Sequence, residues 1–156
     1  MAEQQHTYLT QEGLEKMKKE LDYLKSTKRM EVAQRLKEAI ALGDLSENSE
    51  YVSAKDEQAT VEGKILEYEA KIRTAVIIEA SKSGHVSMAS SVVIKDLAAG
   101  EEEEVTIVGS SEADPFEGKI SNESPVGHAL IGAKPGDIVE VNAPAGILKY
   151  QVIEVK

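Results

Sequence analysis

The segment "GDLSENSEY" at residues 43–51 gathers acidic and amide side chains between two long helical patterns. Asp44 and Glu47 are three positions apart, a spacing that on a helix puts both carboxylates on one side with Cβ atoms about 5–6 Å apart. Carboxylate oxygens are preferred ligands of hard divalent cations such as Mg²⁺. Two carboxylates cannot fill an octahedral shell, and no histidine or cysteine is near them in the sequence. The pattern therefore favours an ion that a partner also ligates.

The same two acids also fit a structural role. Asp44-x-x-Glu47 matches a capping box, in which Asp44 would be the N-cap of the second helix and the Glu47 side chain would reach back to the backbone. Acidic residues in a first helical turn also interact favourably with the helix macrodipole. The residues alone leave the metal role and the capping role open.

Two helical patterns flank this segment. The first covers residues 11–42, with Thr10 as candidate N-cap and Gly43 as the residue that ends it. Its apolar seam consists of Leu14, Met17, Leu21 and Leu24, followed by Ala33, Leu36 and Ile40. The seam of the second helix consists of Tyr51, Ala54, Gln58, Val61, Ile65, Tyr68 and Ile72. Two such helices predict an antiparallel coiled-coil hairpin on the order of 45 Å long.

After residue 75 the hydrophobic period changes to about two, which is typical of strands. Turn signals such as "KPGD" and "APAG" separate these strands, and "SPVGHALIG" predicts a short helix that begins near Pro125. The sequence therefore predicts an α+β protein. Its parts are a hairpin arm at residues 1–76 with an acidic tip at 43–51, a linker at 77–83, and a mainly antiparallel sheet domain with one short helix at 84–156.

Composition limits the function classes. The formal net charge of −10 argues against a protein that coats nucleic acid, although basic residues outnumber acidic ones between residues 11 and 43. The absence of cysteine excludes disulfides and thiolate metal sites. No export signal is visible, and the apolar stretches are too short to span a bilayer. We expect a soluble cytoplasmic protein with no membrane partner.

The tip "GDLSENSEY" with the following "AKDEQATVEGKI", and the later stretch "GSSEADPFEGKISNESPVGHALIGAKPGDIVEV", resemble the bacterial Gre transcript-cleavage factors. The likeness extends from "LTQEG" to the final strand. It implies an FKBP-like C-terminal domain and a coiled-coil arm that enters the secondary channel of a backtracked RNA polymerase. It also implies that Asp44 and Glu47 help to hold a second Mg²⁺ beside the polymerase's own aspartates.

By this resemblance the chain is not an enzyme, because the polymerase itself hydrolyses the 3′ end of the backtracked RNA. We expect the free chain to be a monomer that holds no metal stably. A Gre-like regulator that binds the channel without stimulating cleavage is the alternative, against which the presence of Asp44 and Glu47 argues. A purely structural arm would be indifferent to the charge of its tip.

The resemblance also suggests roles for other tip residues. Ser46 is a candidate backbone partner, and Tyr51 either packs in the seam or stacks on a base. Asn48 is either a first-turn residue or a hydrogen-bonding partner of transcript or bound water. Lys55 falls on a basic position of the family and Lys37 lies near one. Both are candidate RNA contacts, or simply part of a solvated face. The approach to the tip at residues 40–42 is uncharged, which predicts a weak grip on RNA and short cleavage products.

The loop "EADPFEG" carries the candidate docking residues. In the family this loop belongs to the domain that docks at the rim of the polymerase channel, so Asp114, Pro115 and Phe116 are predicted to contact the polymerase. The alternative is that Phe116 is tucked into its own domain. The segment "SPVGHAL" is the second choice for docking. A prolyl isomerase of the FKBP type would need an aromatic-lined pocket, for which residues 79–156 offer only Phe116 and Tyr150.

Overall fold

The computed structural model describes residues 5–43 and 47–156, so Asp44, Leu45 and Ser46 of the predicted tip lie outside the described residues. The chain divides into two compact units. One contains residues 14–74, and the other contains residues 6–13 together with 75–156. Within the described residues, no helix combines the length and the apolar character that a membrane span requires.

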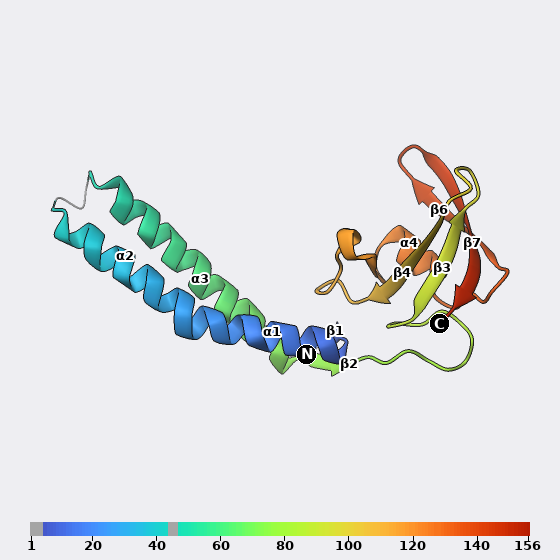
Figure 1. Cartoon of the computed structure of the whole chain (residues 1–156), viewed down its shortest axis with the longest axis horizontal. Coiled ribbons are helices and arrows are strands. Elements are labelled where there is room, and N and C mark those ends of the chain that lie inside the picture. The colour runs from blue at the N-terminus through green and yellow to red at the C-terminus, as the bar shows by residue number, and fades with distance from the viewer. Residues whose placement is uncertain (1–4, 44–46) are drawn as a thin grey trace. The chain divides into compact units, whose positions relative to one another are not determined.

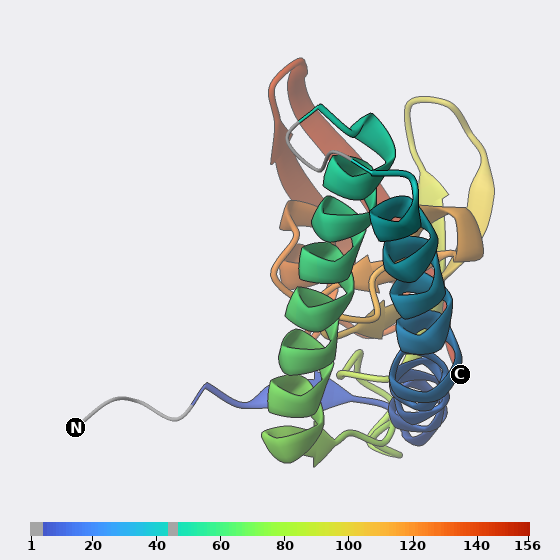
Figure 2. The ribbon, with the colours of Figure 1, turned by 90° about the vertical axis from the view of Figure 1, so that its left-hand side faces the viewer.

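The first unit is a helical hairpin (Figures 1 and 2). The ascending limb consists of α1 (Gln11–Tyr23), a π-helical turn η1 (Leu24–Lys28) and α2 (Arg29–Ala41), and the returning limb is α3 (Ser49–Arg73). Thr10 Oγ1 accepts a hydrogen bond from Gly13 N at 3.0 Å, which confirms Thr10 as the N-cap. Gly43 follows the end of α2 with φ +114°, as expected of the residue after a helix. The predicted antiparallel hairpin is confirmed.

The π-helical turn corrects the predicted seam of the ascending limb. Arg29 N donates to Leu24 O across five residues, so this turn contains one residue more than an α-helical turn. A seam of Met17, Leu21 and Leu24 continued at 3-4 spacing would turn residues 31, 35 and 38 inward, and the extra residue moves these positions to 32, 36 and 39. Val32 and Ala39 are therefore buried, whereas the predicted seam residues Ala33 and Ile40 are exposed.

The returning limb keeps its predicted seam throughout. Its Ala54, Val61 and Ile65 are buried. The apolar core of the hairpin consists of Leu24, Val32, Val61 and Ile65, with Leu21, Leu36 and Tyr68 packed against them. This core lies away from the turn between α2 and α3. Among the described residues nearer that turn, the completely buried apolar ones are Ala39 and Ala54.

The second unit is built on a five-stranded sheet with strand order β5-β4-β3-β7-β6. The strands are β3 (Ser91–Asp96), β4 (Glu102–Val108), β5 (Lys119–Ser121), β6 (Ile138–Ala143) and β7 (Gly146–Val155). All neighbours pair antiparallel except β4 and β5, which are parallel. The predicted mainly antiparallel sheet with one short helix, α4 (Pro125–Leu130), is confirmed.

The core of this unit lies between the sheet and α4. Strand β3 alternates buried and half-buried residues, as a strand with one covered face should. Leu130 of α4 is completely buried and belongs to the same cluster as Val92, Ile107 and Val152. Ser124 caps α4 by accepting from Gly127 N at 3.1 Å, and Pro125 occupies its first turn as predicted.

A short parallel pair, β1 (Thr7–Leu9) with β2 (Ala75–Ile77), completes the second unit and was not predicted. Leu9 is completely buried. The loop after β4 holds the chain beyond β1 through Glu112, whose carboxylate accepts from Thr10 N at 2.7 Å and from Thr10 Oγ1 at 2.6 Å. Gly13 leaves space for this carboxylate, since an added Cβ there would overlap it.

Two glycines of the second unit are predicted to be sensitive to substitution. A Cβ on Gly127 would overlap the carbonyl oxygen of Ser121, and one on Gly109 would overlap that of Tyr8. We expect each change to alanine to destabilise this unit by about 1–3 kcal/mol, because backbone atoms must move to make room. Gly63→Ala is the matched control, since it lies in α3 with open space around it, and it should stabilise the helix by about 0.5–1 kcal/mol. Amide hydrogen exchange in β3, β7 and α3 measures the stability change in all three variants. If Gly63→Ala destabilised the protein as much as the other two, the prediction would be contradicted.

Candidate functional site

The candidate site lies where α2 ends and α3 begins. Glu47 is exposed and precedes α3, whose N-cap is Asn48. Asn48 has extended backbone angles, and its Oδ1 accepts from Tyr51 N at 3.1 Å. The capping-box interpretation is therefore wrong for Glu47, which stands before the N-cap and not at the third helical position. Asp44 and Ser46 lie outside the described residues.

The Asn48 amide also connects the two helices. Its Nδ2 donates to the carbonyl oxygen of Ala39, in the last turn of α2, at 2.8 Å. Both ends of the amide thus have partners within the hairpin, one on each helix. Sequence reasoning did not find this bond. A contact of Asn48 with transcript or bound water stays a prediction.

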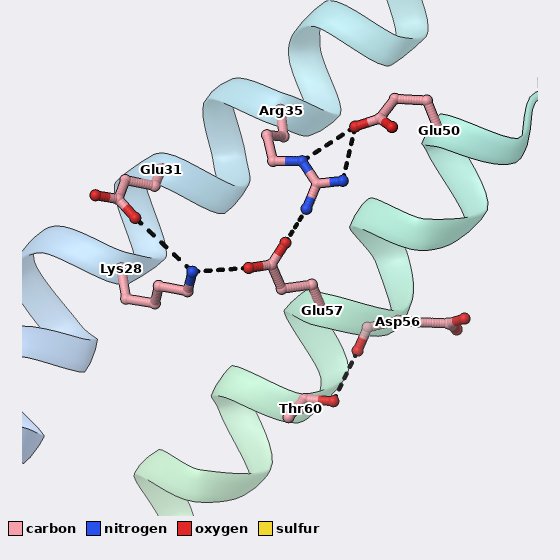
Figure 3. A network of polar contacts seen from close by, with 7 residues as sticks. All are labelled: Lys28, Glu31, Arg35, Glu50, Asp56, Glu57 and Thr60. Carbon is pink, nitrogen blue, oxygen red and sulfur yellow. Dashed lines mark hydrogen bonds and ion pairs between the residues drawn. The ribbon is translucent and has the colours of Figure 1, made fainter.

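An ion-pair network continues down the hairpin from the same end (Figure 3). Arg35 of α2 donates from Nε and Nη2 to one carboxylate oxygen of Glu50, at 3.0 and 2.7 Å. Its Nη1 pairs with Glu57, which also accepts from Lys28 Nζ at 2.8 Å. Glu50 is exposed to solvent, and its carboxylate is nevertheless paired with Arg35. One negative charge of the crowded segment is offset by a cation from the opposite helix.

The charges of this network are paired, and most of their side chains are half-buried. The hydrogen bond from Lys28 holds the pKa of the Glu57 carboxyl below its ordinary value, and the Arg29 hydrogen bond does the same for Glu62. The hydrogen bond to Glu50 raises the pKa of the Arg35 guanidinium. The paired groups are therefore charged at neutral pH, and they connect the helices in one register.

We predict that the hairpin loses stability in acid. Carboxyls whose folded pKa is lowered stabilise the fold above their ordinary pKa of 4.5, and that contribution is lost as pH falls through the lower folded pKa. The helical melting temperature should thus fall between pH 6 and pH 3, and added salt should reduce the difference. Circular dichroism at 222 nm measures it. The variant Glu57→Gln with Glu62→Gln should show a smaller pH dependence, and an equal dependence would contradict the assignment.

The remaining tip candidates lie on the same two helices. Lys37 of α2 and Lys55 of α3 are exposed, and Lys55 Nζ donates to Gln58 at 3.3 Å. Tyr51 is half-buried in the first turn of α3. The uncharged approach to the tip is also exposed, with Leu42 75% accessible. Contact of these residues with RNA stays a prediction.

The loop of the second unit presents Phe116 to solvent. Phe116 is fully exposed, so the alternative that it is tucked into its own domain is excluded. Asp114 Oδ1 accepts from Phe116 N at 3.0 Å and caps the 3₁₀ turn η2 (Pro115–Glu117), with Pro115 in its first turn. Two backbone hydrogen bonds between Asp114 and Lys119, at 2.8 and 2.9 Å, close the base of the loop. The Phe116 ring is therefore held outward on a turn that these hydrogen bonds stabilise.

The second choice for docking is partly buried, and the metal role of the tip acids stays a prediction. The segment "SPVGHAL" forms α4, whose Gly127 and Leu130 are buried in the sheet domain. Among residues 5–43 and 47–156, no group of three or more His, Cys, Asp or Glu is arranged to hold a metal ion. The exposed carboxylate of Glu47 has the chemistry of one Mg²⁺ ligand.

Comparison with known proteins identifies the family. The family model "Transcription elongation factor, N-terminal" matches residues 7–77, and "Transcription elongation factor, GreA/GreB, C-term" matches residues 80–156. A relative from Clostridioides difficile, "Transcription elongation factor GreA", is 53% identical over 100% of this chain and 99% of its own length. One of the same name from Clostridium acetobutylicum is 50% identical, with 100% of both chains covered. Among solved structures, the GreA factor homolog 1 (Gfh1) protein of Thermus thermophilus is 30% identical with a TM-score of 0.44, covering 97% of this chain and 99% of that one. The chain belongs to the GreA/GreB family of transcription elongation factors.

Proposed function

We propose that this protein stimulates the transcript-cleavage activity of RNA polymerase by bringing the carboxylates of Asp44 and Glu47 to the polymerase active centre. The observation that carries the proposal is the position of Glu47. It is exposed, it lies at the turning point of a helical hairpin, and it stands outside the helix that Asn48 caps. Its carboxylate is therefore not used in capping α3. Relatives about 50% identical over their full length carry the name of transcription elongation factor GreA.

The chemistry follows from an incomplete ligand set. Asp44 and Glu47 supply hard oxygen ligands, and the polymerase's own aspartates complete the site for a second Mg²⁺. Two ions in such a site would stabilise the attacking and the leaving oxygen of phosphoryl transfer. The two carboxylates also orient the attacking water near the phosphodiester bond. The polymerase remains the enzyme, and this chain holds no metal stably alone.

The other candidate residues bind the polymerase and the RNA, and so place the tip at the active centre. The hairpin enters the secondary channel, and the loop with Asp114, Pro115 and Phe116 docks at the channel rim. Lys37 and Lys55 face the 3′ end of the backtracked RNA. Because Leu42 and its neighbours are apolar and exposed, the grip on RNA is weak and the released fragments are short.

The test is a cleavage assay on stalled, backtracked polymerase complexes with end-labelled RNA. Addition of this protein with Mg²⁺ should accelerate shortening of the transcript and release mainly short fragments. Binding to the polymerase without acceleration would overturn the proposal in favour of a channel-binding regulator. Predominantly long fragments would contradict the weak grip on RNA.

The prolyl isomerase alternative is disfavoured, because Phe116 projects into solvent while Tyr150 packs against the core of the sheet.

A further inference from the structure

We propose that Arg35 and Asn48 are positioning residues that hold the ends of α2 and α3 together and so set the position of Glu47. We call Arg35, Ala39, Asn48 and Glu50 the tip clamp. The proposal rests on the proposed function, in which Glu47 must reach a catalytic centre in a defined geometry. Neither positioning residue needs to touch substrate or metal.

The first link of the tip clamp is the Asn48 amide. Asp and Ser cap helices about as well as Asn, so capping alone does not require an amide. Asn differs because its amide places an acceptor oxygen and a donor nitrogen on separate atoms, so that it can accept from one helix and donate to another at the same time. Here the acceptor receives Tyr51 N and the donor reaches Ala39 O. The N-terminus of α3 is thereby bonded to the last turn of α2, one residue from Glu47.

The second link is the Arg35 guanidinium. Two of its nitrogens donate to Glu50 in the first turn of α3, and the third pairs with Glu57 one layer below (Figure 3). A guanidinium holds several fixed directions at once, which a lysine ammonium does not. The three bonds fix Arg35 from two sides. Its positive charge is thus paired with two carboxylates of the opposite helix.

The packing of this end explains why polar links are needed. The large buried apolar residues of the hairpin, such as Val32 and Val61, lie below this end. Ala39 and Ala54 are the completely buried residues of the described chain nearest the tip. Alanine side chains bury little apolar area and therefore hold two helices together weakly. Directional bonds from Asn48 and Arg35 supply the restraint that apolar packing does not.

Two variants and a matched control test the tip clamp in the cleavage assay. Asn48→Ser keeps an uncharged capping oxygen but lacks the amide nitrogen that bonds Ala39 O. Arg35→Gln removes the link to Glu50. Arg29→Gln removes a pair of the same kind, in which Nε and Nη2 of Arg29 bond Glu62 at 2.7 and 2.8 Å, farther from the tip. We expect the first two variants to lower the maximal stimulated rate about 10-fold or more. The protein concentration for half-maximal stimulation should not change, and the control should behave as the parent.

Rescue separates positioning from general loss of stability. In the Glu57→Gln background, which removes the second carboxylate that residue 35 faces, Arg35→Glu should lower the maximal rate. The double variant Arg35→Glu with Glu50→Arg in that background should restore it, because the pair is re-formed with opposite polarity. No recovery in the double variant, or an equal loss in Arg29→Gln, would overturn the proposal.

A second measurement does not depend on cleavage. The chain has no cysteine, so spin labels can be placed at Leu42→Cys and Val52→Cys, two exposed positions on either side of the tip. Electron paramagnetic resonance should give a narrow distance distribution in the parent and in Arg29→Gln, and a broader one in Asn48→Ser and Arg35→Gln. Unchanged distributions would overturn the tip clamp even if cleavage falls. Broadening in a protein that never stimulates cleavage would instead support the tip clamp and refute the proposed function.

Discussion

Replacement of Asp44 by Asn together with Glu47 by Gln is expected to abolish stimulated cleavage, with a loss of at least about 100-fold in the maximal rate. Each change keeps the shape of the side chain and removes the charge that attracts a divalent ion. Gel-resolved single-turnover cleavage at saturating protein measures the effect. Binding to the polymerase should be retained, because the loop that we propose to dock, with Asp114, Pro115 and Phe116, is untouched.

The same double variant should leave stability almost unchanged. The helix α3 is capped by Asn48, so neither substitution removes the cap. Glu47 is exposed, and substitutions at exposed positions usually alter the free energy of unfolding by less than about 0.5 kcal/mol. Asp56→Asn with Glu38→Gln is the control for charge, since it removes the same two charges from exposed positions of the hairpin. Full activity in the double variant, or a loss in the control as large as in the variant, would refute the ligand role.

The helical hairpin could be predicted because its signals are local and repeated. The seam of α3 recurs over the whole helix, and Thr10 and Gly43 mark helix ends by their own backbone preferences. The π-helical turn could not be predicted in the same way. It depends on how the two limbs pack against each other, and it placed Val32 and Ala39 inside where the periodicity favoured Ala33 and Ile40.

The choice of helix cap at the candidate site was also beyond local pattern. Asp44 and Asn48 are both good caps with nearly equal intrinsic preference, so the sequence does not decide between them. The bond from Asn48 to Ala39 O is a tertiary contact that favours Asn48. Because Asn48 is the cap, Glu47 lies before the helix. Its carboxylate is then not used in capping and has the chemistry of a Mg²⁺ ligand.

The Arg35–Glu50 pair had a signal in the sequence that was not used. Arg35 stands eight residues before Gly43 and Glu50 seven residues after it, so an antiparallel hairpin that turns near Gly43 brings them level. By contrast, β1 and β2 are three residues each, too short for any period to show. An ion pair between two helices can be predicted from the sequence when the position of the turn is known, whereas strands of three residues cannot.

Loss of the exposed ring in Phe116→Ser is expected to raise the protein concentration for half-maximal stimulation about 10-fold or more. The ring is fully exposed in the free chain and is held outward by a turn that the Asp114 side chain caps by accepting from Phe116 N. Its removal therefore takes nothing from the core of the second unit, and the melting temperature should not change. An aromatic anchor of this kind adds binding free energy only when a partner covers it.

The maximal rate distinguishes docking from chemistry. At saturating Phe116→Ser protein, the rate should equal that of the parent, because the tip acids still reach the active centre. Ile147→Ser is the control, an exposed apolar residue of β7 in the same unit, and it should leave the half-maximal concentration unchanged. If Phe116→Ser and the control behave alike, the docking surface lies elsewhere on the second unit. If instead only the maximal rate falls, the loop acts on the cleavage step, and the division between a docking unit and a catalytic tip is wrong.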